Sequence, residues 1–427
     1  MSMQHTSTSR AQWRGRVFIA AWVLYAGYYI CRKDMSMIKG SAISSLAVSL
    51  ACFGGMYAVG QLVGGTLADR IGARRTALAG AGISILCTVS LVWCNQPVLA
   101  LLLQLGNGFG QGFGWPALLK LLGGWFGPGE RDRVLGWWST SYILGGLLAS
   151  SLAAWLLLNA GGPTRTGFHP AYLVSSAVLL CSALFFFKET WRLPAAPREI
   201  GAPPTSPDLA APAHPWRQLL SNRRIRVIAS MYFFLKMTRY TLLFWLPNYL
   251  ISYLGYRATS AAHMASYFEL FGFLGPLAAA YAVQRYFSQR RMALGAGMLF
   301  VLAFLCLVHP MLASSGETGL VLSIALMGIL IHGADILMSG MAVLDAVPKE
   351  LHGRASGLVN AIGSIGQALS PLLVTVYVSH LGWTKLFDLF VFFALVAGAI
   401  CAFGARNEAQ FTSTLNRSAL ETASSSL

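Results

Sequence analysis

Two arginines, Arg32 and Arg239, stand inside apolar stretches of the sequence, each more than ten residues past the arginines that precede its stretch. A charged residue near the centre of a membrane-spanning helix costs at least about 2.5–3.5 kcal/mol and marks a functional site by default. Guanidinium groups bind tetrahedral oxyanions through two parallel N–H bonds. The two arginines therefore predict a binding site for one phosphoryl dianion.

The surroundings of the two arginines repeat. Arg32 ends a one-face pattern with spacings i, i+4 and i+7, and Arg239 ends the same pattern 207 residues later. The two triplets are Tyr25, Tyr29 and Arg32, and Tyr232, Lys236 and Arg239. A second pair of matching segments is Arg133-x-x-Gly136 and Arg354-x-x-Gly357. These matches favour two parallel halves, an arrangement found in many secondary transporters, with the binding site between the halves.

The charged side chains inside the apolar stretches leave two interpretations open. The cations are Arg32, Lys33, Lys236 and Arg239, and the acids are Asp34, Glu269 and Asp335. In one interpretation Arg32 pairs with Asp34 or Glu269. Arg239 then pairs with Asp335, and both arginines are structural. In the other, both guanidiniums are unpaired and hold an anionic ligand, because the cations match or outnumber the acids.

Tyrosine and histidine residues near these charges also have two interpretations. Tyr25, Tyr29 and Tyr57 either donate hydroxyl groups to a ligand or pack as core aromatics. His332 and Asp335 lie one helical turn apart and form either a proton relay or a buried pair. The sequence alone does not choose between these interpretations.

Other kinds of chemistry are disfavoured. The glycines of the segment 106–116 look superficially like a nucleotide loop, but no strand precedes them and no GKS or GKT follows, so close helix packing is expected. The seven cysteines are scattered and form no CxxC pair, which argues against a disulfide framework and a metal site. We therefore expect no enzyme, no cofactor and no bound metal.

The elements that position these residues are membrane helices. Of the 427 residues, 56% are hydrophobic and only 11% are charged, whereas soluble domains carry about 25% charged residues. Twelve apolar stretches, the first at Val17–Ile38 and the last at Trp383–Phe403, are each long enough to span a bilayer. Because the bilayer core offers the backbone no water, the spans must be helices. The predicted class is an all-α membrane protein.

The basic residues set the orientation. Twenty-two arginines and lysines fall on one side of the predicted spans and four, Lys39, Arg165, Arg257 and Lys385, on the other. This bias places both termini in the cytoplasm and explains most of the net charge of +16 without nucleic acid. The expected organisation is an N-terminal tail (1–16), a six-helix half (17–187), a proline-rich linker (188–226), a second six-helix half (227–403) and a C-terminal tail (404–427).

The segment Gly65-Thr-Leu-Ala-Asp69-Arg70-Ile-Gly72-Ala-Arg74-Arg75 resembles the loop signature of the major facilitator superfamily. The resemblance implies twelve helices in two pseudo-symmetric halves. In that family the acidic residue contacts a helix end of the other half and latches one access state. Asp69 is expected to take that part here, and Gly65 to allow the close approach. The other residues of the expected latch are Arg70, Arg133 and Arg354.

A more specific pattern joins several segments: Tyr28-Tyr29-Ile-Cys-Arg32-Lys33-Asp34, Gln111-Gly112-Phe-Gly114-Trp115-Pro116, Lys120, Arg239-Tyr240 and Phe268-Glu269. It resembles the organophosphate:inorganic phosphate antiporters, which include glycerol-3-phosphate and hexose-phosphate transporters. The resemblance implies that two arginines hold the substrate phosphate. The expected substrate-binding residues are Arg32, Arg239, Lys33, Lys236, Tyr25, Tyr29, Tyr57, Trp115, Glu269 and His332.

Departures from the family pattern leave the organic part of the substrate open. Gln61 and Tyr142 replace a lysine and a histidine of some relatives. Lys236 and His332 stand where glycerol-3-phosphate carriers tend to have tyrosine. A cationic Lys236 favours a second anionic group on the substrate, as in phosphoglycerate or phosphoenolpyruvate.

The expected function is exchange of an organophosphate for inorganic phosphate by alternating access, by a monomer in a cell inner membrane. One alternative is a proton-coupled symporter of an organic anion, with Glu269, His332 or Asp335 as the proton site. Another is a sugar-phosphate sensor that does not transport. A drug exporter is disfavoured, because a basic cavity suits cationic amphiphiles poorly.

Overall fold

The computed structural model describes residues 2–32, 43–94, 96–159, 170–194, 214–288 and 290–424. Side chains are placed within these ranges except at 2–10, 43–50, 150, 153–159, 170, 384 and 407–424. Every regular element in the described ranges is a helix. The predicted all-α class is therefore confirmed.

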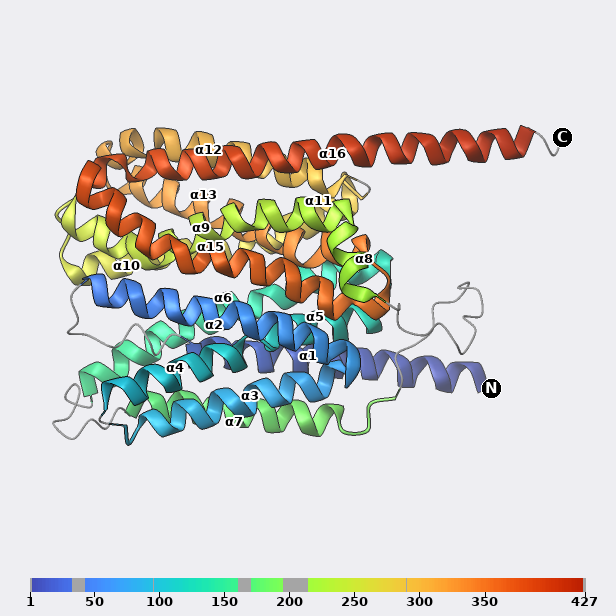
Figure 1. The fold of residues 1–427 in the computed structure, drawn as a ribbon, viewed down its shortest axis with the longest axis horizontal. Helices are drawn as coiled ribbons and strands as arrows, with labels where there is room; N and C mark the ends of the chain where they lie inside the picture. Colours follow the sequence, from blue (N-terminus) through green and yellow to red (C-terminus); the bar gives the residue numbers. More distant parts are fainter. Residues whose placement is uncertain are drawn as a thin grey trace.

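The described part of the N-terminal half contains six helical rods, drawn from blue to green in Figure 1. One rod is broken into two helices. The helices are α1 (Ser2–Arg32), α2 (Ile43–Arg70), α3 (Ala73–Leu91), the broken rod α4 (Pro97–Gln111) and α5 (Gly114–Trp125), α6 (Pro128–Asn159) and α7 (Pro170–Thr190).

The C-terminal half has the same plan, and a short helix, α8 (Pro215–Ser221), precedes it. Its helices are α9 (Arg223–Ser252), the broken rod α10 (Ala258–Gly272) and α11 (Leu274–Arg285), α12 (Arg291–Ser314), the rod α13 (Glu317–Ile336), η2 (Leu337–Ala342) and α14 (Val343–Ala346), then η3 (Lys349–Leu351), α15 (His352–Leu381), η4 (Trp383–Lys385) and α16 (Leu386–Ser424). Six segments of the described chain are long and apolar enough to cross a membrane by length and composition.

Local chemistry explains several helix boundaries. Asn222 caps α9, because its side-chain oxygen accepts hydrogen bonds from the backbone N–H groups of Arg224 (2.9 Å) and Ile225 (3.2 Å). Gly72, with φ of +95°, makes the turn from α2 into α3, a conformation that side chains with a Cβ rarely adopt. Helices α1 and α16 extend through residues predicted as tails, and both termini leave the same end of the bundle (Figure 1). We call this the termini end.

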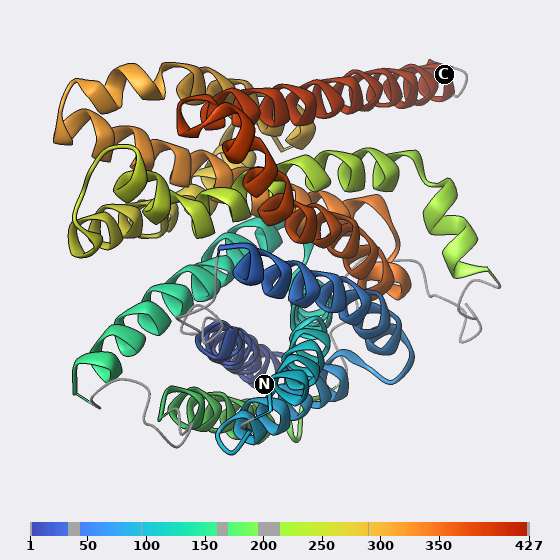
Figure 2. The same cartoon turned by 60° about the vertical axis from the view of Figure 1, so that its left-hand side comes forward.

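The two halves lie side by side, with blue-to-green helices on one side and yellow-to-red helices on the other (Figure 2). Helix α2 packs along α15, and α6 packs against α11, so both contacts join one half to the other. The contact between α2 and α15 needs glycine: a Cβ on Gly65 would lie 2.4 Å from the carbonyl oxygen of Gly353.

The glycine-rich segment before Trp115 packs helices closely, as predicted. A Cβ on Gly112, where the fourth rod breaks, would lie 2.7 Å from the carbonyl oxygen of Tyr57 on α2. A Cβ on Gly110 would lie 2.8 Å from the carbonyl oxygen of Gly80 on α3. The helix that follows begins with Gly114 and Trp115, and the indole of Trp115 donates to the carbonyl of Ser339 in the other half at 3.4 Å.

Candidate anion-binding site

A cavity with an empty volume of about 220 Å³ lies where the two halves meet. Only about 10 Å³ of it can hold the centre of a water molecule, so in this state it is far smaller than the roughly 300–1,000 Å³ of most small-molecule sites. Its lining comes from α1, α2, α5 and α6 of one half and α9, α13 and α15 of the other. The lining residues are Tyr25, Tyr29, Tyr57, Trp115, Tyr142, Tyr232, Lys236, Arg239, Tyr240, Asp335 and Asn360.

Arg32, the last residue of α1, lies against two rings of this lining. Its guanidinium carbon is 4.3 Å from the ring centroid of Tyr29 and 4.3 Å from that of Tyr57. Its Nε donates to Oε1 of Gln111 at 3.3 Å, while Nη1 and Nη2 are buried and have no hydrogen-bond partner among the described residues. Asp34, one of its predicted partners, lies outside the described residues, as does Lys33.

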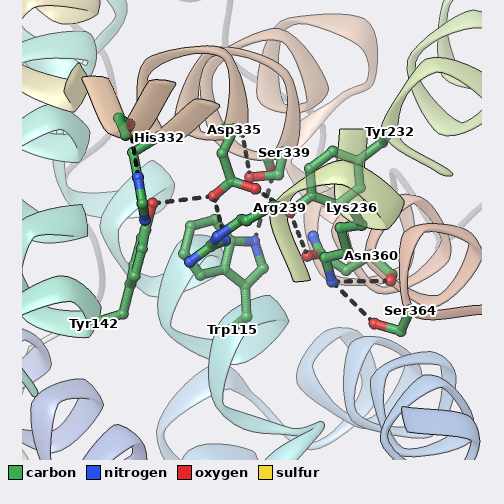
Figure 3. A network of polar contacts seen from close by, with 11 residues as sticks. Trp115, Tyr142, Tyr232, Lys236, Arg239, His332, Asp335, Ser339, Asn360 and Ser364 are labelled. Carbon is green, nitrogen blue, oxygen red and sulfur yellow. Dashed lines mark hydrogen bonds and ion pairs between the residues drawn. The ribbon is translucent and has the colours of Figure 1, made fainter. Parts of the chain in front are cut away.

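Arg239 is different, because it is paired. Its Nη1 lies 3.1 Å from Oδ2 of Asp335, and both side chains are buried. Oδ2 also accepts the hydroxyl of Tyr142 at 3.1 Å, and Oδ1 accepts that of Tyr232 at 2.7 Å (Figure 3). The prediction that both arginines are unpaired is therefore wrong for Arg239, which has the ion pair of the alternative interpretation.

Lys236 is a buried ammonium group, 2% exposed, with neutral partners. Its Nζ donates to the hydroxyl of Ser364 at 2.9 Å and to the carbonyl of Asn360 at 3.4 Å. The hydroxyl of Ser364 in turn donates to Oε1 of Gln61, on α2 of the other half, at 2.9 Å. The aromatic ring of Tyr57 lies 5.6 Å from Nζ, so Tyr57 contacts both Lys236 and Arg32.

The backbone next to Asp335 is irregular. A π-helical stretch, Leu337–Ala342, begins two residues later. Within it the hydroxyl of Ser339 donates to the carbonyl of Asp335 at 2.7 Å, and the indole of Trp115 donates to the carbonyl of Ser339 at 3.4 Å. Segments of π-helix frequently occur at functional sites. Here Ser339 links the backbone of Asp335 to an indole of the other half.

His332 and Glu269 lie at the edge of this arrangement. The ring of His332 lies between those of Tyr142 (6.0 Å between centroids) and Phe268 (5.2 Å). Its Nδ1 is 2.8 Å from the carbonyl oxygen of Gly328, whereas Asp335 is held by Arg239 and two tyrosines. Glu269 is half-buried on α10 and is not among the described residues that line the cavity.

Asp69 joins the halves at the termini end. Its Oδ1 accepts the backbone N–H of Gly353 at 3.0 Å, and its Oδ2 accepts the N–H of Arg354 at 3.0 Å. Arg354 adds its guanidinium at 3.2 Å, and Lys120 its ammonium at 2.5 Å. The carboxylate thus sits at the N-terminus of α15, where unpaired N–H groups favour an anion.

A second cluster of ion pairs joins the halves at the same end. Asp345 pairs with Arg131 and Arg291, and Arg291 also pairs with Asp132 at 2.6 Å. A larger cavity beside it is lined by Asp132, Arg291 and Asp345 among others. Arg70 and Arg133, which the resemblance assigned to the latch, are exposed. The residues before Arg133 carry the contact instead.

Sequence analysis missed several of these residues as parts of the sites. Tyr142, Tyr232, Tyr240 and Asn360 line the cavity, and Arg131, Asp132, Arg291 and Asp345 form the second cluster. Tyr232 belonged to the repeated triplet, so its position was available as a signal. Tyr240 stood in the quoted family pattern and Tyr142 at a position where some relatives have a histidine, so both were signals too. No sequence pattern indicated which helix the remaining residues face.

The fold and the sites together define a membrane transport protein rather than an enzyme. The profile of the Major Facilitator Superfamily matches residues 17–334 and, in a second match, residues 228–422. The chain belongs to this superfamily, which confirms the predicted fold of twelve helices in two halves. The solved proton:xylose symporter XylE aligns with a TM-score of 0.73 at 13% identity, over 94% of this chain and 96% of its own. FucP in the outward conformation aligns with a TM-score of 0.69 at 13% identity, over 92% and 98%.

Curated relatives point to a narrower group. A glycerol-3-phosphate transporter of Bacillus subtilis (strain 168) is 24% identical over 90% of each chain. The glucose-6-phosphate exchanger SLC37A2 of Xenopus laevis is 26% identical over 91% of each. The membrane sensor protein UhpC of Salmonella typhimurium (strain LT2) is 28% identical over 90% of this chain and 88% of its own. These relatives confirm the resemblance to the organophosphate:phosphate antiporter family.

Proposed function

We propose that the protein exchanges an organophosphate for inorganic phosphate by alternating access, through the cavity between its halves. Arg32, Lys236 and Arg239 provide the positive charge, and the tyrosines around them provide hydroxyl donors. The names of the curated relatives, which include a glycerol-3-phosphate transporter and a glucose-6-phosphate exchanger, support a phosphate ester as the cargo.

The observation that carries the proposal is the state of Arg32. Two of its guanidinium nitrogens are buried without a hydrogen-bond partner among the described residues. A buried donor that stays unpaired costs about 1–3 kcal/mol, and more when it is charged. A phosphate oxygen would satisfy these donors through charge-assisted hydrogen bonds. Arg32 is therefore the first contact we propose for the anion.

Alternating access follows from the charge of the loaded and empty cavity. Arg32 and Lys236 repel each other across Tyr57 when no anion is bound, which opposes closure of the halves. A phosphate dianion neutralises them and draws the halves together. Because the empty carrier then rarely changes state, transport becomes exchange. We further propose that the carrier works as a monomer in the inner membrane, with the termini end in the cytoplasm and residues 17–187 and 227–403 as its moving halves.

The test is exchange of radiolabelled phosphate in proteoliposomes loaded with phosphate. Arg32→Lys keeps the charge but loses the bidentate geometry, so we expect exchange to fall by at least about tenfold, or 1.4 kcal/mol. The matched control is Arg257→Lys, the same change at an exposed arginine that caps α10, and it should exchange normally. Wild-type exchange by Arg32→Lys would refute the role of Arg32. Competition by sugar and three-carbon phosphates would identify the cargo.

A second candidate function is a sensor that binds a phosphate ester without moving it. The observation that favours it is the relative named as a membrane sensor, UhpC, at 28% identity. Saturable binding of a phosphate ester by the purified protein, with no exchange in the same proteoliposomes, would support the sensor over the exchanger.

A further inference from the structure

Asp335 lies at the centre of the cavity's polar network. Its side chain is 2% exposed, and its two oxygens accept one guanidinium hydrogen bond from Arg239 and two phenolic hydrogen bonds from Tyr142 and Tyr232. These donors come from α9 and α6 and converge on one residue of α13 (Figure 3). A guanidinium with two hydroxyl groups is also a donor set that suits a phosphoryl oxygen.

The two cavity arginines therefore differ in whether their guanidinium groups already have an anionic partner when a ligand enters. Arg32 offers Nη1 and Nη2 without a hydrogen-bond partner among the described residues. Arg239 offers a guanidinium already bonded to a carboxylate at 3.1 Å. The Nε of Arg239 is also buried without a hydrogen-bond partner among the described residues. A ligand that takes the Nη1 bond and the full charge of Arg239 must nevertheless displace that carboxylate, because both anions bind the same guanidinium.

We propose that Asp335 is a built-in competitor of the substrate, a positioning residue that sets affinity by occupying Arg239. The inference rests on the proposed function, since it takes a phosphate or phosphate ester as the ligand. When only a fraction of the protein has Arg239 free, the apparent dissociation constant rises by the inverse of that fraction. Asp335 thus weakens binding and speeds release, which an exchanger needs on both sides of the membrane.

The local structure permits such an exchange of partners. All three donors to Asp335 are side chains, so none is fixed by a helix backbone. The π-helical stretch that begins at Leu337 interrupts the regular hydrogen bonding directly after Asp335. The carboxylate can therefore leave Arg239 by rotation of one side chain, without unfolding a helical turn.

Equilibrium dialysis of radiolabelled inorganic phosphate against the full chain in nanodiscs tests the proposal. Asp335→Asn keeps the shape and one oxygen, which can accept from one of the two tyrosines, but removes the charge. We expect the dissociation constant for phosphate to fall about tenfold, which corresponds to Arg239 being free about a tenth of the time. The control is Asp388→Asn, the same change at an exposed acid paired with Lys385, and it should bind phosphate as the wild type does.

A double-mutant cycle separates this mechanism from simple electrostatics. If Asp335 acts by occupying Arg239, Asp335→Asn gains nothing in an Arg239→Gln background. If the gain persists there, the carboxylate acts through its charge at a distance and the proposal is overturned. Weaker binding by a folded Asp335→Asn protein also overturns it, because Asp335 would then hold Arg239 in its binding position.

The remaining outcomes are also decisive. Where Asp335→Asn does not fold, Asp335→Ser removes the same charge with a smaller side chain, and the same gain is expected. A wild type that binds phosphate, with no gain in either variant, overturns this inference alone. A wild type that binds neither phosphate nor any phosphate ester overturns the proposed function as well.

Discussion

Asp69 and Asp335 are both buried carboxylates that join the two halves, but their donors differ in kind. Asp69 takes two backbone N–H groups at the start of α15, together with Arg354 and Lys120. Among the described residues, the carboxylate of Asp335 accepts from three side chains, one guanidinium and two phenols, and from no backbone group.

This difference suits Asp69 to hold the halves together and Asp335 to exchange its partners. Backbone donors at a helix N-terminus keep their geometry as long as the helix exists, so the donors to Asp69 stay in place whenever α2 and α15 are in contact. Side-chain donors can rotate to a new acceptor while every helix stays in place. We therefore infer that the contacts of Asp69 depend on the relative position of the halves, whereas the contacts of Asp335 depend on whether an anion occupies the cavity.

The largest effect is expected from Asp69→Asn, which tests whether Asp69 holds the termini end closed. The change leaves the buried guanidinium of Arg354 and the ammonium of Lys120 without their carboxylate. Removing one partner of a buried ion pair costs about 3–5 kcal/mol. We expect the termini end to open. Labelling of Ala355→Cys, a buried position on α15, by a maleimide measures the opening in a background without the seven native cysteines.

The control for this variant is Glu130→Gln, since Glu130 is an exposed acid at the same end that pairs with Arg14. It should leave the labelling of Ala355→Cys unchanged. Equal labelling in Asp69→Asn and the unaltered background would show that Asp69 does not hold the end closed, and the contrast with Asp335 would be lost.

A smaller effect is expected from Gly65→Ala, which disturbs the packing of α2 against α15. The added methyl group would lie 2.4 Å from the carbonyl oxygen of Gly353 and 3.1 Å from Cα of Gly357, both on the backbone of α15. Forcing an extra carbon into such a contact costs about 1–3 kcal/mol. The expected result is faster maleimide labelling of Ala355→Cys than in the background, and slower than in Asp69→Asn.

Gly55 offers a matched control on the same helix. Apart from the backbone of α2 itself, no atom of the described residues lies within 4 Å of a Cβ built there. Gly55→Ala should therefore stabilise α2 slightly, by about 0.5–1 kcal/mol, and leave labelling unchanged. If Gly55→Ala and Gly65→Ala behave alike, the close approach of α2 and α15 does not control the opening.

The sequence predicted the fold well because its signals lie within single segments. Apolar length defines a span, and the spacing of Tyr25, Tyr29 and Arg32 places them on one face whatever the other helices do. The glycines near Trp115 likewise predicted close packing, which the contacts of Gly110 and Gly112 confirm.

Contacts between helices were less predictable, because they depend on rotation and on partners far apart in the chain. The sequence left open whether Arg239 is unpaired or pairs with Asp335. The ion pair became evident only from the packing of α9 against α13. Arg133 is exposed, while Arg131 and Asp132 form the ion pairs of the second cluster. Neighbouring residues on a helix point about 100° apart, so a motif match displaced by one position selects the wrong face.

The smallest effect, and the sharpest test of Asp335, comes from comparing Tyr142→Phe with Tyr232→Phe. Each removes one hydroxyl donor to the same carboxylate, and a hydrogen bond to a charged group contributes about 1.5–3 kcal/mol. Tyr142 lies on α6 of the N-terminal half, so its bond must break when the halves separate at the cavity. Tyr232 lies on α9, in the same half as Asp335, so its bond can persist throughout the cycle. We therefore expect Tyr142→Phe to change the rate of phosphate exchange at saturating phosphate, and Tyr232→Phe to change chiefly the affinity. Equal effects of both variants on the saturated rate would mean that the bond between the halves does not limit their separation, and Asp335 would then act within the C-terminal half alone.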